Sequence, residues 1–221
     1  MRAMTDARDR LNRLIALASD NAPENRRTLA VELCDLLLDW PEHYPATMRE
    51  PFEALLEKTV RLIDEETRRV LVAKLAPHAE TPLLLLNEFY FDAPADTRDA
   101  IVLRNALLQD RAPPQLPATD EKQVVSAARS KSNGEFTAAF ASMLGIETAT
   151  AQRILQDRTG RALAIACKGA HLARATFSAL ALLTEAGTAP DETRERLSSF
   201  DSVPLTGAER LLDFWRHRPA A

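Results

Sequence analysis

Glycine is scarce in this sequence, with 6 among 221 residues, and this argues against a fold that needs many tight turns. An all-β chain of this length needs such turns at short intervals. Aromatic residues are also few, at 5%, and alanine and leucine supply most of the apolar side chains. Because both of these residues favour helix, the composition predicts an all-α fold.

Cysteine is nearly absent, since only Cys34 and Cys167 occur, far apart and each within an apolar helical pattern. We expect two reduced core thiols rather than a disulfide or a metal site. Acidic residues on both sides of Cys34 predict a raised thiol pKa and hence a poor nucleophile. The sequence also lacks a metal-ligand spacing, a phosphate-binding glycine loop and a hydrolase nucleophile motif. It therefore predicts no catalytic residue, no cofactor and no metal.

Long hydrophobic runs are missing as well. Runs such as Leu83–Leu86 are far shorter than a bilayer span, and the first residues lack the apolar core of a signal peptide. The net charge of −4 does not match nucleic acid for the molecule as a whole. These features predict a soluble protein of the cytoplasm with no membrane partner.

One short phrase recurs along the chain: an acidic turn, then an arginine, then the first apolar residues of a helix. It occurs at Asp20–Leu29, Asp64–Leu71 and Asp92–Ile101, with a weaker echo at Pro190–Leu197. Recurrence of a local design at intervals of tens of residues is typical of stacked helical repeats.

The acid and the arginine of this phrase predict two kinds of contact. The acid at each helix start can accept hydrogen bonds from the first backbone amides of that helix. The arginines, Arg26, Arg68 and Arg98, can each reach a carboxylate in the turn of a neighbouring repeat and so form a ladder of ion pairs. The alternative is that acidic residues, proline and threonine gather at any helix start and that the arginine is merely tolerated there.

Apolar residues at helical spacing predict helices along the whole chain, and no segment favours a strand. The uninterrupted apolar segment Leu83–Phe91 predicts an inner helix buried on both sides. The proline-rich segment 111–117 is the predicted linker between helical repeats in 1–110 and a C-terminal helical domain in 118–221, packed on the first. The helices expected beyond the linker cover about 120–131, 134–144, 148–157, 161–169, 173–186, 191–199 and 206–217.

The repeated phrase resembles the Asp…Arg signature of HEAT repeats, and the chain is similar to a bacterial family, the domain of unknown function 2336, from about its first helix to its last. The residues that carry the resemblance are Leu14–Ala30, Leu62–Pro77, Met143–Ile146 and Ala162–Lys168. The resemblance implies a right-handed HEAT-like stack of antiparallel helical hairpins, an α-solenoid, with a less regular C-terminal part. It implies no activity, cofactor or site. The shortened turn at Asp64 leaves the repeat register there open.

A helix-turn-helix form at 136–157 raises an alternative, a DNA-binding regulator. Ala141, Gly145, Ala151 and Ile154 fall where that motif has a small residue, a turn glycine and two core positions. Residues 126–174 hold seven Lys or Arg against three Asp or Glu, a net charge of +4. Against DNA binding, the pattern recurs 26 residues later, as a packing repeat does, and the second helix has one basic residue.

The preferred prediction is therefore a non-catalytic adaptor or regulatory scaffold that binds another protein along its surface. A basic face that suits an acidic protein partner is predicted from Arg129, Lys131, Arg153, Arg158, Arg161, Lys168 and Arg174. Aromatic contact anchors are predicted at Trp40, Tyr44 and Trp215.

Overall fold

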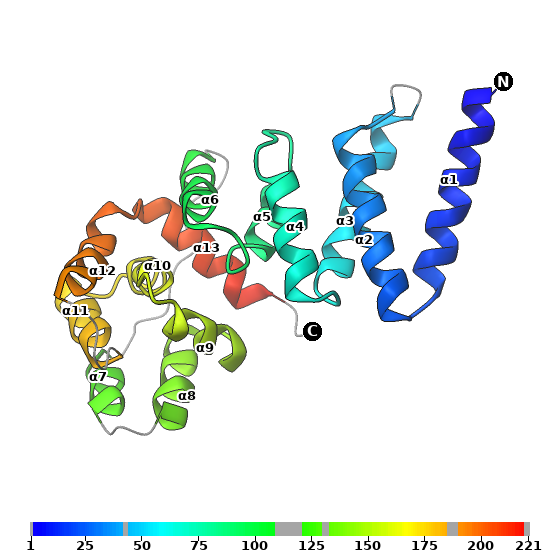
Figure 1. The fold of residues 1–221 in the computed structure, drawn as a ribbon. Coiled ribbons are helices and arrows are strands. Elements are labelled where there is room, and N and C mark those ends of the chain that lie inside the picture. Colours follow the sequence, from blue (N-terminus) through cyan, green and yellow to red (C-terminus); the bar gives the residue numbers. More distant parts are fainter. Residues whose placement is uncertain (1, 42–43, 109–120, 130–132, 185–189, 219–221) are drawn as a thin grey trace. The chain divides into compact units, whose positions relative to one another are not determined.

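The computed structural model describes residues 2–41, 44–108, 121–129, 133–184 and 190–218, and this part of the chain is all helical, with no strand (Figure 1). The fold class predicted from composition is confirmed at this level. The chain divides into two compact units, residues 1–98 and 99–220. The boundary lies within a helix, between Arg98 and Asp99, whereas the predicted linker 111–117 lies outside the described residues.

The first unit is a series of helices that pack on their near neighbours in sequence. Helix α2 packs against α1, α3 and α4, and α3 also packs against α5. The elements are α1 (Arg2–Ser19), α2 (Pro23–Leu38), the 3-10 helix η1 (Ala46–Met48), α3 (Arg49–Val60), α4 (Glu65–Leu75), α5 (Leu83–Glu88) and the beginning of α6 (Ala95–Leu107).

Helix α5 and the turn that follows it lie in the core of this unit. Leu85, Leu86, Phe89 and Tyr90 are all buried. Leu83 is half-buried and Leu84 is 60% exposed, so the predicted helix buried on both sides is confirmed only beyond its first two residues.

Helices α4 and α3 begin in different ways. Helix α4 begins after Asp64, which is its N-cap and accepts a hydrogen bond of 3.0 Å from the Thr67 amide. Helix α3 follows a 3-10 turn, and its N-cap, Met48, makes no side-chain bond.

The second unit contains the rest of α6 and seven further helices. Their ends lie within three residues of the predicted ones: α7 (Glu121–Arg129), α8 (Asn133–Leu144), α9 (Thr148–Gln156), α10 (Arg161–Gly169), α11 (Arg174–Leu183), α12 (Pro190–Ser202) and α13 (Leu205–His217).

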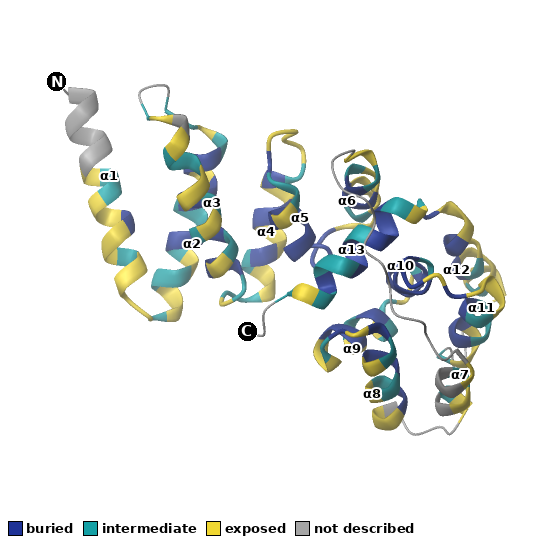
Figure 2. Ribbon diagram, turned by 180° about the vertical axis from the view of Figure 1, so that it is seen from behind, coloured by how far each residue is buried: buried dark blue, intermediate teal, exposed yellow. Residues whose placement is uncertain are grey.

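Helix α10 is the centre of the second unit and packs against α9, α11, α12 and α13. Every residue from Ala162 to Cys167 is buried, and the helix is dark along its length in Figure 2. Its last residue, Gly169, lies so close to α13 that an added Cβ would be 2.6 Å from the carbonyl oxygen of Ala208. The absence of a side chain therefore sets the distance between these two helices.

Both cysteines are free and buried, which confirms the expected core thiols. Burial raises the pKa of the Cys34 thiol to about 11, and the neighbouring Asp35 adds to the effect. At neutral pH this thiol stays protonated, so it is a poor nucleophile.

Candidate partner-binding surfaces

The repeated acid-and-arginine phrase builds a buried ion pair in the first unit. The side chains of Arg68 and Asp92 are 7% and 1% exposed, and Nε of Arg68 donates to Oδ2 of Asp92 over 2.8 Å. The same guanidinium donates to the carbonyl oxygens of Val60 and Glu88, each over 2.5 Å. Arg68 thus joins the turn after α3 to the turn after α5, as the ladder predicts.

A second cross-turn pair links the starts of α2 and α4, but through a different arginine from the predicted one. Nε of Arg27 lies 2.5 Å from Oδ2 of Asp64, whereas Arg26 donates to Asn21 in its own turn. Successive helical residues point about 100° apart, so only one of the two can reach α4. Arg98 donates to the carbonyl oxygens of Phe91 and Ala93 in the turn before its own helix.

The hydrogen bonds to Asp64 give a pH-dependent prediction. The Thr67 amide, followed by the Thr67 hydroxyl and Arg27, lowers the pKa of Asp64 well below its usual value. A lowered carboxyl pKa stabilises the fold above the unfolded pKa of about 4, and this contribution fades as the pH falls below that value. Asp64→Asn keeps a capping oxygen but loses the charge. We expect it to be less stable than the wild type at pH 7, with a gap that narrows at pH 3, as measured by urea unfolding. A gap of equal size at both pH values would contradict this assignment.

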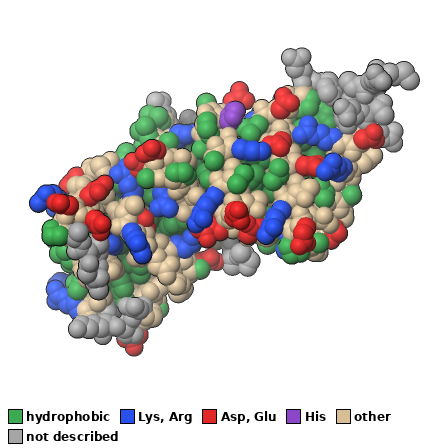
Figure 3. Space-filling view, viewed as in Figure 1, with side chains coloured by type: hydrophobic (Ala, Val, Ile, Leu, Met, Phe, Trp, Pro, Cys, Tyr) green, Lys and Arg blue, Asp and Glu red, His purple; other side chains and the backbone are tan. Residues whose placement is uncertain are grey.

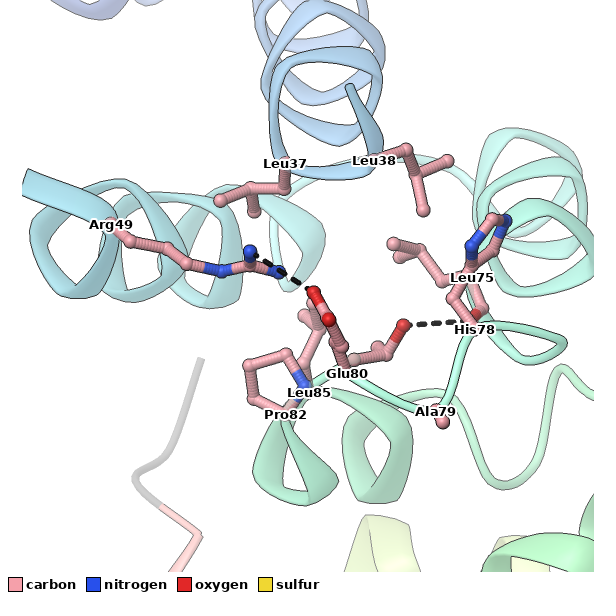
Figure 4. A pocket seen from close by; sticks show the side chains of 10 residues that line it. Leu37, Leu38, Arg49, Leu75, His78, Ala79, Glu80, Pro82 and Leu85 are labelled. Atoms are coloured by element: carbon pink, nitrogen blue, oxygen red, sulfur yellow. Dashed lines mark hydrogen bonds and ion pairs between the residues drawn. The ribbon is translucent and has the colours of Figure 1, made fainter. Parts of the chain in front are cut away.

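A cavity of about 300 Å³ opens in the first unit (Figure 4). Most of its wall is apolar, and polar side chains stand at its rim. It is lined by Leu37, Leu38, Arg49, Leu75, His78, Ala79, Glu80, Thr81, Pro82 and Leu85. The wall thus comes from the end of α2, the start of α3, the end of α4 and the loop into α5. The hydroxyl of the buried Thr81 donates to the carbonyl oxygen of Leu75 over 2.7 Å, which fixes this loop.

Arg49 reaches across the cavity toward Glu80 in Figure 4. Its Nε donates to Oε1 of Glu53, one turn along α3, over 2.9 Å. Its Nη1 lies 3.5 Å from Oε2 of Glu80, whose side chain is 83% exposed. The rim of the cavity therefore presents a guanidinium that is held firmly from one side and weakly from the other.

Within the described residues, no group of three or more His, Cys, Asp or Glu side chains is arranged to hold a metal ion. None of the helices described is long and apolar enough to span a bilayer.

The comparison with protein families decides the assignment. Residues 47–213 match the model of the family described as an uncharacterised protein conserved in bacteria, the domain of unknown function 2336. The chain belongs to this family. No curated protein matches the chain, and no solved structure does. The matched region begins just before α3, so it includes the Arg49 side of the cavity, whereas Trp40 and Tyr44 precede it.

The predicted aromatic anchors have two different environments. Trp40 and Tyr44 are half-buried, with ring centroids 5.6 Å apart, and Trp40 also packs edge-on against Phe52 at 5.9 Å. They stand in the connection that leaves α2 next to Leu37 and Leu38 of the cavity wall. Trp215 is 1% exposed, so it belongs to the core of the second unit and cannot serve as a surface anchor.

The residues of the predicted basic face are partly engaged within the second unit. Arg161 pairs with Asp99, Arg174 pairs with Asp201 over 2.8 Å, and Lys168 donates to the carbonyl oxygen of Phe200 over 2.8 Å. Arg129 and Arg158 are exposed, Arg153 is half-buried, and Lys131 lies outside the described residues. On the side of the molecule drawn in Figure 3, Lys and Arg side chains lie next to Asp and Glu side chains. Binding of an acidic partner by these cations stays a prediction.

Helices α8 and α9 pack on each other and are joined by a short turn, which fits the helix-turn-helix pattern of the sequence. Gly145 has a left-handed φ of 67°, and the amide of Ile146 donates to the carbonyl oxygen of Ala141 over 3.1 Å. Ala151 and Ile154 are buried, as the motif predicts. Thr150, which lies on the second helix of the motif, is 2% exposed and cannot contact a base.

The 26-residue repeat places His171 where the first copy has Gly145. His171 has a left-handed φ of 56°, and the amide of Leu172 donates to the carbonyl oxygen of Cys167 over 2.9 Å, the bond that Ile146 makes in the first copy. The His171 ring compensates with a contact of its own, since its Nε2 lies 2.8 Å from the buried carboxylate of Glu209. The repeat is therefore structural as well as sequential.

These two positions give a matched pair of stability predictions. Gly145→Ala should lower the free energy of unfolding by about 1 kcal/mol, because the Cβ of alanine is sterically unfavourable in the left-handed backbone conformation. Its nearest neighbour is a side-chain atom of Arg216, 3.8 Å from the added Cβ, so no clash contributes. His171→Ala should cost more than His171→Gly, because both lose the Glu209 contact but only alanine keeps the backbone penalty. Urea unfolding measures all three, and a neutral Gly145→Ala would contradict the argument.

Proposed function

We propose that the protein is a cytoplasmic, non-catalytic adaptor or regulatory scaffold that binds another protein along a HEAT-like stack of helical hairpins. Two features of the first unit support the stack. Helix α2 packs against α3, and the next two helices pack on this hairpin, α4 on α2 and α5 on α3. The pairs Arg27–Asp64 and Arg68–Asp92 join successive turns.

The cavity of the first unit is the observation that carries the proposal. Its apolar wall can desolvate a side chain of a partner, and its charged rim can orient the chain that bears that side chain. The half-buried rings of Trp40 and Tyr44 follow the cavity-lining Leu37 and Leu38 in the chain, and aromatic side chains are enriched where proteins bind one another. Concave apolar pockets with a few polar groups are the usual form of such sites.

Paired substitutions in neighbouring helices test the proposal. Leu38 lines the cavity and is half-buried, whereas Leu84 is 60% exposed and does not line it. Affinity capture with the full chain as bait, read by quantitative mass spectrometry, should recover a protein with wild type and Leu84→Asp but not with Leu38→Asp. Recovery of the same proteins by both variants would contradict the role of the cavity.

DNA binding through α8 and α9 is the second candidate function, favoured by the left-handed turn at Gly145. Thr148 and Gln152 are exposed on α9, and Arg153 is its one basic residue. A salt-dependent complex with duplex DNA, lost in Arg153→Glu, would support this function and count against the adaptor. We expect no such complex at moderate ionic strength, because a single cation on α9 offers little charge to the phosphates.

A further inference from the structure

Arg49 has hydrogen-bond donors that its two acidic partners in the first unit, Glu53 and Glu80, do not occupy. A guanidinium carries five N–H donors in a rigid fork. The bond from Nε to Glu53 takes one of them, and the contact from Nη1 to Glu80 takes a second at 3.5 Å. The remaining donors belong to a side chain that lines the cavity.

The two acidic partners of Arg49 hold it with different strength. Glu53 is one helical turn away, is 24% exposed and accepts a bond of normal length, so it orients the guanidinium. Glu80 is 83% exposed, and its contact is longer than the 2.7 to 2.9 Å that is usual for a charge-assisted bond. An exposed pair of this kind contributes little free energy, so another carboxylate can replace Glu80 at small cost.

The apolar part of the cavity wall determines which uncharged group can bind beside Arg49. Leu37, Leu75 and Leu85 form the floor of the cavity and are 5%, 2% and 2% exposed, so most of the apolar surface open to a ligand comes from the half-buried Leu38 and Pro82 and from the exposed Ala79. The apolar part of this lining accepts an aliphatic group, whereas the hydrogen-bonding groups of the lining belong to Arg49, His78, Glu80 and Thr81.

We propose that the cavity takes an aliphatic side chain of a partner protein together with a carboxylate beside it, and that Arg49 exchanges Glu80 for that carboxylate. The aliphatic group lies against the leucines, and the carboxylate accepts two parallel bonds from the guanidinium, the geometry that arginine favours. Glu80 acts as an internal competitor for the same donors. This inference rests on the proposed function, since it names the chemistry of the segment that the adaptor binds.

Three small probes with the same aliphatic group separate the inference from the proposed function. They are 4-methylpentanoate, 4-methylpentan-1-ol and 4-methylpentan-1-amine, titrated against the full chain while leucine methyl resonances are followed by NMR. We expect all three to shift methyl resonances of the cavity. The carboxylate should bind about five-fold more tightly than the alcohol, and the amine more weakly than either.

Two variants should move the carboxylate affinity in opposite directions. Arg49→Gln should remove the preference for the carboxylate over the alcohol, and Glu80→Gln should strengthen carboxylate binding about two- to five-fold by removing the competitor. Arg69→Gln is the matched control, because Arg69 also pairs with a glutamate one helical turn away but does not line the cavity. It should leave all three affinities unchanged.

The other outcomes count against one or both claims. Equal binding of carboxylate and alcohol, or tighter binding of the amine, would overturn the inference and leave an apolar pocket as the proposed function requires. A failure of Glu80→Gln to strengthen carboxylate binding would overturn the exchange. Absence of cavity shifts with all three probes would count against the inference and against the cavity as the binding site.

Discussion

Replacement of Arg68 by alanine is expected to lower the free energy of unfolding by about 3 to 5 kcal/mol. The substitution removes the guanidinium that pairs with the carboxylate of Asp92, which is 1% exposed. It also removes the donor from the carbonyl oxygens of Val60 and Glu88. Loss of one member of a buried ion pair is far more costly than loss of a surface contact, because the remaining charge keeps its desolvation penalty.

The adjacent residue provides the control for this prediction. Arg69 lies on the same helix and pairs with Glu65, but its side chain is 63% exposed, so Arg69→Ala should change stability by no more than about 0.5 kcal/mol. The double variant Arg68→Met with Asp92→Leu should lose less stability than Arg68→Ala, because it replaces both charges of the buried pair by apolar side chains. Urea unfolding at pH 7 measures all three. Equal losses for Arg68→Ala and Arg69→Ala would contradict the structural role of the buried pair.

Gly169→Ala should destabilise the protein by about 1 to 3 kcal/mol. An added Cβ at this position lies 2.6 Å from the carbonyl oxygen and 2.9 Å from the carbonyl carbon of Ala208, so α10 and α13 must move apart. These are backbone atoms, and they cannot rotate away as the end of a flexible side chain can. The shift would disturb the packing of every helix that contacts α10, because protein interiors have few voids to accommodate it.

Gly134 supplies the opposite expectation within the same unit. A Cβ added there meets nothing within 4 Å, and the residue is exposed near the start of α8. Gly134→Ala should therefore raise stability by up to about 1 kcal/mol through helix propensity alone. Opposite signs for the two substitutions in thermal or urea unfolding support the close approach of α10 and α13. A destabilisation of similar size in both variants would contradict it.

The helices could be predicted closely from the sequence because their signals are local. Apolar spacing placed the helices of the second unit, and the unbroken apolar segment identified α5 as buried. The glycine at position 145 marked a left-handed turn, which needs only the preference of one residue. Each of these features depends on residues within a turn or two of one another.

Contacts between helices were harder to predict, because they depend on how each helix is rotated about its axis. A single helical position decided that Arg27 rather than Arg26 reaches Asp64. In the same way, the rotation of α13 about its axis places Trp215 in the core, although its sequence context was compatible with an exposed ring. His171 has a glycine-like backbone, and the signal for it in the sequence is the 26-residue repeat, in which position 171 corresponds to Gly145.

The cavity could not be predicted at all, since its wall comes from four segments between Leu37 and Leu85 and no motif marks them. The predicted basic face could be located in the sequence, but the ion pairs within it could not. The sequence identifies its cations but not the carboxylates that face them, such as Asp99 and Asp201. Charge counted along the chain therefore overstates the charge that a partner meets.

Hydrogen–deuterium exchange of the full chain tests the central claim most directly. Exchange is measured for the chain alone and for the chain bound to a protein that wild type captures and Leu38→Asp does not. The account predicts slower exchange at the end of α2, at the start of α3 and along the loop from Leu75 to Leu85, where the amides surround the cavity. Protection confined to α8 and α9, or spread over the second unit with the cavity segments unchanged, would contradict it.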